Sequence, residues 1–174
     1  MDTLTLTDVM AAPPAPGESY ASIHAMAAWA TLQMGLRQPD VVLTHPGADV
    51  PYLQRWWIIP RNDRCNVYLH RFLRSDDERA LHDHPWPNVS WLIEGKYLEH
   101  TPEGTFHRRP GDLVEREATS SHRIELIDGQ PVTSLFFTGP KEREWGFHCE
   151  RGWVHWQEFL GSYDGSQPGK GCGA

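Results

Sequence analysis

The chain has 174 residues, of which 39% are hydrophobic, so it can form one compact domain with its own core but has little room for a second. Its formal charge is −7 and Lys and Arg do not cluster, which argues against nucleic acid as a partner. No apolar run approaches the roughly 18 residues that cross a bilayer, and the N-terminal residues lack the basic start of a secretory signal. The sequence therefore predicts a cytoplasmic protein that does not contact membranes.

The first 36 residues divide into two segments of different composition. Residues 1–18 contain the stretch Ala-Ala-Pro-Pro-Ala-Pro-Gly and are expected to be a flexible arm, because they have too little apolar surface to order themselves. From Ser19, apolar side chains recur at helical spacing as far as Leu36, which predicts one amphipathic helix. Residues 19–162 are expected to form a single domain that includes this helix, and residues 163–174 a flexible C-terminal tail.

After Pro39 the sequence turns to short runs rich in β-branched and aromatic residues, each bounded by Gly, Pro, Asp or Asn. These runs predict strands over residues 52–59, 66–73, 89–93, 106–108, 113–116, 123–127, 132–138 and 153–159. Glu94-Gly95 and Asp128-Gly129 lie between such runs, where glycine can adopt the positive φ of a tight hairpin. The order indicates consecutive antiparallel strands and an all-β fold.

The three cysteines give no sign of a disulfide framework or a zinc ribbon, because Cys65, Cys149 and Cys172 are scattered and no C-x-x-C spacing occurs. Their thiols are expected to be reduced. His148, Cys149 and His155 could supply soft-metal ligands, but residues 153–157 alternate like an ordinary half-buried strand, which favours packing.

The most informative local motif is His82-Asp83-His84. Residues two apart on an extended strand project to the same face, so both imidazoles can reach one ion. A mononuclear site needs at least a third protein ligand, which this motif does not supply. The alternative interpretation is a polar strand end that faces solvent.

Two longer patterns resemble the motifs of the cupin superfamily. The first cupin motif, G-x5-H-x-H-x3,4-E-x6-G, corresponds at the same spacings to Asp76, His82, His84, Asn88 and Gly95. The second motif, G-x5-P-x-G-x2-H-x3-N, corresponds to Gly111, Glu117-Ala118-Thr119, His122 and Leu126. Every histidine of both motifs is present.

The resemblance covers residues 66–138 and implies a cupin-type double-stranded β-helix, or jelly-roll barrel, with one divalent metal on His82, His84 and His122. Two imidazoles from one strand and a third from a strand across the barrel would form a rigid facial set that leaves positions open for water, oxygen or substrate. Fe(II) is the expected ion, with Zn, Ni or Mn as alternatives. Cupins commonly pair through their sheets, so a homodimer is also considered.

Asn88 stands where the first cupin motif has its glutamate. The metal shell is therefore either a neutral three-His set or one to which Asn88 adds a weak amide-oxygen ligand. The Pro, Gly and Asn of the second motif are also replaced. Those positions form turns and do not bind metal, so their loss bears on the loop and leaves the ligand in place.

Three-His sites without the glutamate are typical of thiol dioxygenases related to cysteine dioxygenase, and other segments resemble that family. Arg61-Asn62 precedes the strand that leads to the histidine pair, as the family's carboxylate-binding arginine does, and residues 122–125 and 131–135 resemble its second half. The family's Ser-x-His-x-Tyr falls on Ser134, Phe136 and Thr138, so its histidine and tyrosine are missing. Cysteine itself is therefore not the expected substrate.

The resemblance predicts a mononuclear non-haem iron oxygenase or dioxygenase that acts on a small molecule. Arg61 would pair with a substrate carboxylate, Trp86 would wall the pocket and Tyr97 would line the barrel mouth. The alternatives are a surface ion pair for Arg61 and contact with water for Tyr97. Two other functions stay open: a non-oxidative metallocupin (isomerase, lyase or hydrolase) and a non-catalytic cupin that binds a ligand or builds an assembly.

Overall fold

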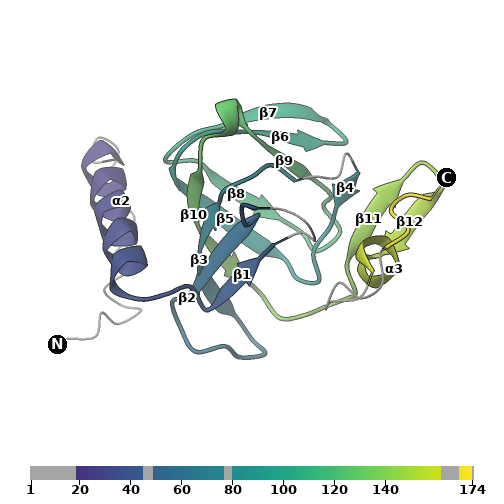
Figure 1. Ribbon diagram of the computed structural model, residues 1–174, viewed down its shortest axis with the longest axis horizontal. Coiled ribbons are helices and arrows are strands. Elements are labelled where there is room, and N and C mark those ends of the chain that lie inside the picture. The colour runs from purple at the N-terminus through teal and green to yellow at the C-terminus, as the bar shows by residue number, and fades with distance from the viewer. Residues whose placement is uncertain (1–18, 45–48, 77–79, 162–168, 174) are drawn as a thin grey trace.

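The computed structural model describes residues 19–44, 49–76, 80–161 and 169–173, and these form an antiparallel β-barrel with a long helix on its outside (Figure 1). The predicted arm over residues 1–18 lies outside the described residues. The largest sheet contains, in spatial order, β1 (Val41–Leu43), β2 (Leu53–Trp57), β3 (Asn66–Phe72), β10 (Val132–Thr138), β5 (Asn88–Glu94) and β8 (Leu113–Arg116). A second sheet contains β7 (Gly104–Arg108), β6 (Tyr97–Thr101) and β9 (Arg123–Leu126), and a third contains β12 (Gly152–His155), β11 (Gly146–Cys149) and β4 (Leu81–His82).

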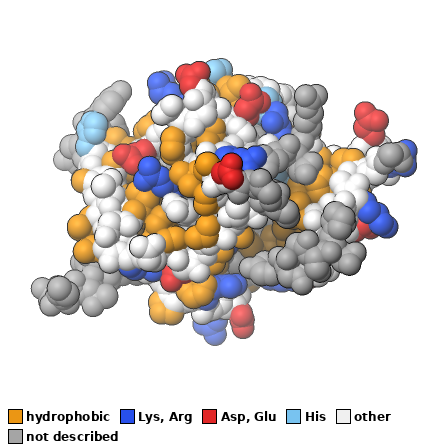
Figure 2. Space-filling model, viewed as in Figure 1, with side chains coloured by type: hydrophobic (Ala, Val, Ile, Leu, Met, Phe, Trp, Pro, Cys, Tyr) orange, Lys and Arg blue, Asp and Glu red, His pale blue; other side chains and the backbone are white. Residues whose placement is uncertain are grey.

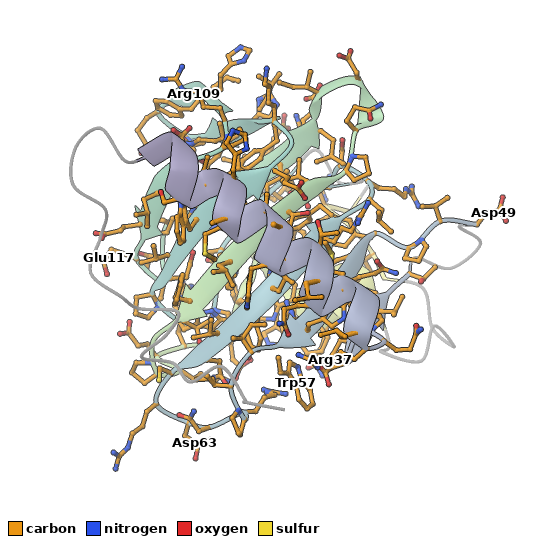
Figure 3. All side chains as sticks on the ribbon, turned by 90° about the vertical axis from the view of Figure 1, so that its left-hand side faces the viewer. Arg37, Asp49, Trp57, Asp63, Arg109 and Glu117 are labelled. Atoms are coloured by element: carbon orange, nitrogen blue, oxygen red, sulfur yellow. A yellow bond between two sulfur atoms is a disulfide. The ribbon has the colours of Figure 1, made fainter. Side chains whose placement is uncertain are left out.

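Helix α2 (Ser19–Leu36) lies across the outer face of the largest sheet, and its bounds confirm the predicted helix (Figure 3). The predicted apolar face is wrong at its C-terminal end, because Leu36 is exposed. Met26, Ala27 and Ala30 pack against a cluster of buried strand residues: Trp56, Val67, Leu69, Ile93 and Leu135. At the helix end, the Trp56 indole donates to the Arg37 carbonyl at 3.1 Å, and the Arg37 guanidinium donates to the Trp57 carbonyl at 2.6 Å. The helix is therefore fastened to β2 as well as packed on the sheet.

The inner face of the largest sheet points into the barrel. Because successive side chains alternate between the two faces of a strand, Val67 and Leu69 face α2 while Tyr68 and His70 face inward. A second apolar cluster fills part of the interior between this sheet and β6 and β9, and it consists of Leu92, Tyr97, Ile124, Leu126 and Val132. The barrel therefore has one core outside the sheet and one inside.

The two predicted glycine turns adopt positive φ, at +79° for Gly95 and +63° for Gly129, but the expectation that they close hairpins is wrong. β5 pairs with β10 and β8, whereas β6 pairs with β7 and β9, so Gly95 carries the chain from one sheet to another. A Cβ on Gly95 would lie 2.4 Å from the Pro131 carbonyl oxygen. The chain just after the Gly129 turn therefore lies directly against the Gly95 turn, and only glycine fits at position 95.

The C-terminal part departs from the prediction of one strand over residues 153–159. The strand β12 ends at His155, and a short helix α3 (Trp156–Leu160) follows. The His155 side chain accepts a hydrogen bond from the Gln157 amide at 3.3 Å, which caps this helix and explains why the extended run stops. The strands β1, β4, β6 and β11 were not among the predicted runs.

The expectation of three reduced cysteines is wrong, because Cys149 and Cys172 form a disulfide while Cys65 is free and exposed. The hairpin β11–β12 and α3 fold the chain back on itself, so two cysteines 23 residues apart meet with their Cα atoms 5.4 Å apart. The amides of Lys170 and Gly171 also donate to carbonyls of α3, each at 3.0 Å. The described part of the predicted tail is thus tied to the hairpin.

Among the described residues, no helix is long and apolar enough to cross a membrane. On the face seen in Figure 2, Lys and Arg side chains are scattered between acidic and hydrophobic ones.

Candidate metal centre

The three histidines of the sequence motifs come together at one end of β4, on the side of the barrel nearest the C-terminal hairpin (Figure 1). β4 ends at His82, and His84 follows it in extended chain. His82 and His122 form a backbone bridge, in which each amide donates to the other's carbonyl at 2.9 Å. The expectation that His122 comes from across the barrel is wrong, since it lies on the segment directly beside His82.

The three imidazoles point toward one another. One nitrogen from each ring lies within 4.8 Å of the others, and the ring centroids are 4.9 to 5.3 Å apart. The Nε2 atoms of His84 and His122 are 2.9 Å apart. Two nitrogens bound at right angles to one ion, each at about 2.1 Å, would lie roughly 3 Å apart. The donor set therefore fits a single divalent cation.

Glu99 orients the most buried of these rings. Its carboxylate is 1% exposed and lies 2.9 Å from Nδ1 of His122. Because the carboxylate accepts a hydrogen bond from Nδ1–H, the proton of the neutral ring stays on Nδ1, and Nε2 is unprotonated and turned toward the other histidines. Asp76 lies in a similar place for His82, 3.8 Å from its Nδ1. In metal sites, a histidine ligand commonly donates the N–H of its other ring nitrogen to a carboxylate.

Two arginines hold Glu99 in place. Arg108 Nε donates to it at 2.6 Å, and Arg116 donates through both Nε, at 2.8 Å, and Nη2. Burial alone would raise the pKa of Glu99, but the hydrogen bonds from His122 and Arg116 outweigh it and hold that pKa well below its usual range. Glu99 is therefore a fixed negative charge behind His122.

Burial favours the neutral form of two of the three histidines. Burial lowers the pKa of His122 to about 4, helped by the charge of Arg116 and opposed by the hydrogen bond to Glu99. Burial also holds the pKa of His84 well below its usual value, and the other two histidines and the arginines add to this effect. Only the neutral imidazole can donate a lone pair to a metal, so His84 and His122 are in their binding form near neutral pH.

Aromatic side chains surround the cluster. Trp145 and Phe147 lie with ring centroids 6.4 and 6.0 Å from that of His82. Trp86 and Phe136 lie 6.4 and 5.8 Å from His84. These rings place apolar surface beside the cluster, and His82 and His84 stay partly exposed.

Asp83 points away from its two histidine neighbours, as strand alternation requires. It is fully buried and accepts hydrogen bonds from the Gly146 amide at 2.8 Å, the Trp153 indole at 2.9 Å and the Arg143 guanidinium at 3.0 Å. It also lies 3.1 Å from Nε2 of His148. The middle residue of the His-Asp-His motif therefore anchors the C-terminal hairpin beside the cluster.

The other residues predicted for the site lie in different surroundings. Asn88 is buried, and its side-chain oxygen accepts from Arg116 at 3.4 Å, so it belongs to the layer behind the histidines. Tyr97 is buried in the inner apolar cluster, where burial raises its pKa. Arg61 is exposed, and its guanidinium lies 5.7 Å from the ring centroid of Trp57.

The sequence motifs assign no role to Glu99 or to Arg116. The alternation of β6 was a usable signal, because Tyr97 and Glu99 share a face and an apolar partner two residues away indicates an inward side chain. No local pattern in the sequence pairs Glu99 with Arg116, since their contact depends on how the sheets close.

No family model and no curated protein sequence matches the chain. Solved structures do match in fold. The DMSP lyase DddQ from Ruegeria pomeroyi DSS-3 is 14% identical over 75% of each chain, with a TM-score of 0.50. The cupin-2 domain Rru_A2000 from Rhodospirillum rubrum is 12% identical over 64% of this chain and 76% of its own, with a TM-score of 0.53.

A third match, to a chain from the crystal structures of the DMSP lyases RdDddP and RnDddQII, covers 50% of this chain and 47% of that one, with 14% identity and a TM-score of 0.43. The chain thus spans about half the length of that protein. At such identities the likeness concerns the fold alone. Together with the antiparallel strand order, it shows that this chain has the all-β, double-stranded β-helix fold of the cupins.

Proposed function

We propose that this protein is a metal-dependent cupin enzyme that acts on a small molecule through one divalent cation on His82, His84 and His122. The observation that carries the proposal is the convergence of three imidazoles, with Glu99 fixing the proton of one on the side away from the cluster. The Nε2 atoms of His84 and His122 lie 2.9 Å apart. A divalent ion would satisfy both lone pairs.

The residues of the chain have separate tasks in this proposal. The histidines hold the ion on one side, Glu99 increases the basicity of His122, and Arg108 and Arg116 keep Glu99 ionised. The aromatic rings beside His82 and His84 form apolar walls next to the cluster. A cation bound there would supply Lewis acidity or, as Fe(II), exchange electrons with oxygen and substrate.

The first reaction that we propose is a dioxygenase reaction with Fe(II). The three imidazoles would hold Fe(II) from one side and leave room beside it for substrate and oxygen, which is what non-haem iron oxygenases need. Within this proposal Trp86 forms part of the pocket wall, because its ring lies next to His84. Arg61 stays a proposed substrate contact through a carboxylate, and Tyr97 a proposed pocket residue.

The second candidate is a non-oxidative reaction, such as an isomerisation, elimination or hydrolysis. The same observation favours it, because three neutral imidazoles leave the full charge on the cation and so increase its effect on a bound carbonyl or water. Zn, Ni or Mn would serve this chemistry, since imidazole ligands do not by themselves select among these metals.

The experiment begins with metal analysis of protein purified without chelators. We expect about one divalent metal ion per chain in the wild type. His82→Ala should lose this metal while its circular dichroism stays that of the folded barrel, whereas His107→Ala, which changes an exposed histidine of β7, should keep it. Stoichiometric metal in folded His82→Ala would contradict the proposal.

Oxygen consumption then separates the two reactions. The iron-loaded protein is assayed with thiols, diketones and catechols, and zinc-loaded protein is the matched control. Turnover that requires both iron and oxygen supports the dioxygenase. Turnover of a substrate without oxygen uptake, at full occupancy with zinc, nickel or manganese, supports the non-oxidative reaction instead.

A further inference from the structure

The last described segment of the chain, residues 169–173, caps the short helix α3. Two of its amides donate to the carbonyls of Glu158 and Phe159, each at 3.0 Å. Both carbonyls lie in the last turn of α3, where a helix has no donors of its own for them. A Cβ on Gly169 would lie 1.9 Å from the Phe159 carbonyl oxygen, so the segment lies directly against the helix end.

The disulfide keeps this C-terminal segment on the helix. Cys172 belongs to the segment, and its partner Cys149 is the last residue of β11. The other side-chain link is an exposed ion pair at 3.3 Å between Lys170 and Glu158, and such pairs contribute little stability. Because α3 has five residues, it is too short to persist without outside contacts. The position of α3 therefore depends on the disulfide.

Helix α3 supports the aromatic side chains next to a metal ligand. Phe159 stacks on Phe147 with ring centroids 3.7 Å apart, and Trp156 stacks on Trp145 with centroids 5.8 Å apart. We call these four rings the aromatic wall. Phe147 and Trp145 in turn lie 6.0 and 6.4 Å from the ring of His82. Each ring beside His82 is thus backed by a ring of α3.

The backbone makes a second connection between the disulfide and the cluster. β11 pairs with β4, and Phe147 is directly opposite His82 in the register. Cys149 lies two residues further along β11. β4 has only two residues, so few contacts other than this pairing and the bridge to His122 fix its place. A change at Cys149 therefore reaches a metal ligand through one pair of strands.

The disulfide is open to chemical exchange from one side. Cys172 is exposed and Cys149 is half-buried, so a thiolate from solution reaches the sulfur of Cys172 first. Attack there forms a mixed disulfide on Cys172 and releases the Cys149 thiol. The second thiol of a dithiol reductant then frees Cys172. Two electrons and two protons pass to the protein, which gains two thiols, and the reductant becomes a disulfide.

We propose that the disulfide between Cys149 and Cys172 is a redox switch for the three-His cluster. In the oxidised chain, the capped helix holds the aromatic wall against His82. Reduction by a dithiol releases the C-terminal segment, loosens α3 and the wall, and lowers the affinity for the divalent cation. The affinity falls because a ligand that is not held in place loses more freedom when it binds. The inference rests on the proposed function and concerns the regulation of that site.

Zinc titration against a chromophoric chelator is the first test. It compares the oxidised wild type with the double variant Cys149→Ser, Cys172→Ser, which cannot form the link and has no thiols there to bind zinc. We expect the double variant to bind zinc more weakly by about fivefold or more. A smaller difference would overturn the switch. Cys65→Ser is the matched control and should bind zinc as the wild type does, because Cys65 is free and exposed.

Amide hydrogen exchange of the metal-free protein is the second test, measured by NMR before and after reduction with dithiothreitol. We expect exchange to accelerate in α3, in β11 and at the His82 amide, which donates to the His122 carbonyl, while β3 and β10 keep their rates. The double variant should not respond to the reductant. An unchanged rate at His82, or equal acceleration in every strand, would overturn the switch, since the second result means that the whole fold opens.

The two readouts separate this proposal from the proposed function. Zinc binding of equal affinity in the oxidised wild type and the double variant refutes the switch alone. If the oxidised wild type binds no divalent metal, the proposed function fails. The exchange rate at His82 then decides by itself whether the disulfide controls the position of this residue.

Discussion

At the scale of single residues, the histidine cluster depends on charges that the histidine motifs do not contain. Glu99 is almost completely buried, and such a carboxylate is stable only when hydrogen bonds and positive charges replace its lost hydration. Arg108, Arg116 and His122 supply these contacts. The cluster is therefore a network in which Glu99 connects the arginines to a ligand ring.

Glu99→Gln tests this connection. The variant keeps the shape of the side chain but removes its charge, so His122 becomes a weaker base and its proton position is no longer fixed. We expect the affinity for divalent metal to fall by 10- to 100-fold. Competition titration with a chromophoric chelator measures this change.

Glu125→Gln is the control for this measurement, because Glu125 also lies 2.9 Å from a histidine, His100, but on the exposed side of β9. Its metal affinity should equal that of the wild type. Equal affinities of Glu99→Gln and the wild type would show that the carboxylate does not act on the metal site.

At the scale of the elements, the cluster is assembled from segments that the chain brings together by changing sheets. β4 has only two residues, and its place depends on the bridge to His122 and on pairing with β11. The side chain of Asp83 contacts four residues in or next to the C-terminal hairpin: Arg143, Gly146, His148 and Trp153. The hairpin is therefore connected to the three-His cluster through β4 and Asp83.

Asp83→Asn tests this connection. The amide keeps the volume of the carboxylate but loses its charge, and its NH2 group faces donors instead of accepting from them. We expect the free energy of unfolding to fall by about 2 kcal/mol, as for the loss of a hydrogen bond to a charged group. Urea denaturation measures this change, and hydrogen exchange should increase first in β11 and β12.

Asp49→Asn serves as the comparison, since Asp49 is exposed and projects from the barrel (Figure 3). Its unfolding free energy should stay within about 0.5 kcal/mol of the wild type. If Asp83→Asn were as stable as this control, the buried contacts of Asp83 would not hold the hairpin.

At the scale of the whole molecule, the barrel lies between two added layers. Helix α2 covers one side, and the C-terminal hairpin with α3 lies on the other (Figure 1). The hairpin layer has a small core, in which Phe147 stacks on Phe159 with centroids 3.7 Å apart, and the disulfide between Cys149 and Cys172 closes it. A covalent link compensates for the little apolar surface that such a layer can bury.

Cys172→Ser tests the contribution of this link. Closing a loop of 23 residues reduces the entropy of the unfolded chain, which corresponds to about 3 kcal/mol of stability in the oxidised protein. We expect the variant to lose about that much in denaturant unfolding, and a reducing agent to have the same effect on the wild type. Cys65→Ser should change nothing, because Cys65 is free and exposed.

Thiol counting under denaturing conditions checks the premise. The oxidised wild type should show one reactive thiol and the reduced protein three. Identical unfolding curves before and after reduction, with the thiol count changing from one to three, would mean that the link does not stabilise the fold.

The sequence by itself determined the fold class, the helix from Ser19 to Leu36, most of the strands and the three histidines. These features are local, since helical periodicity, strand alternation and the spacing of a His-x-His pair are all set by backbone geometry over a few residues. Their resemblance to the cupin motifs supplied the register between His84 and His122, which local periodicity does not contain.

Only the tertiary structure decided the rest. In the tertiary structure, the turn at Gly95 connects two sheets and does not close a hairpin. Cys149 is joined to Cys172, and His122 lies beside His82. The tertiary structure also buried Glu99 against Arg116 and brought Arg55, His70 and Ser134 to one wall of the barrel. Each of these contacts joins residues distant in sequence, and their pairing depends on how the sheets close, which no short stretch of sequence encodes.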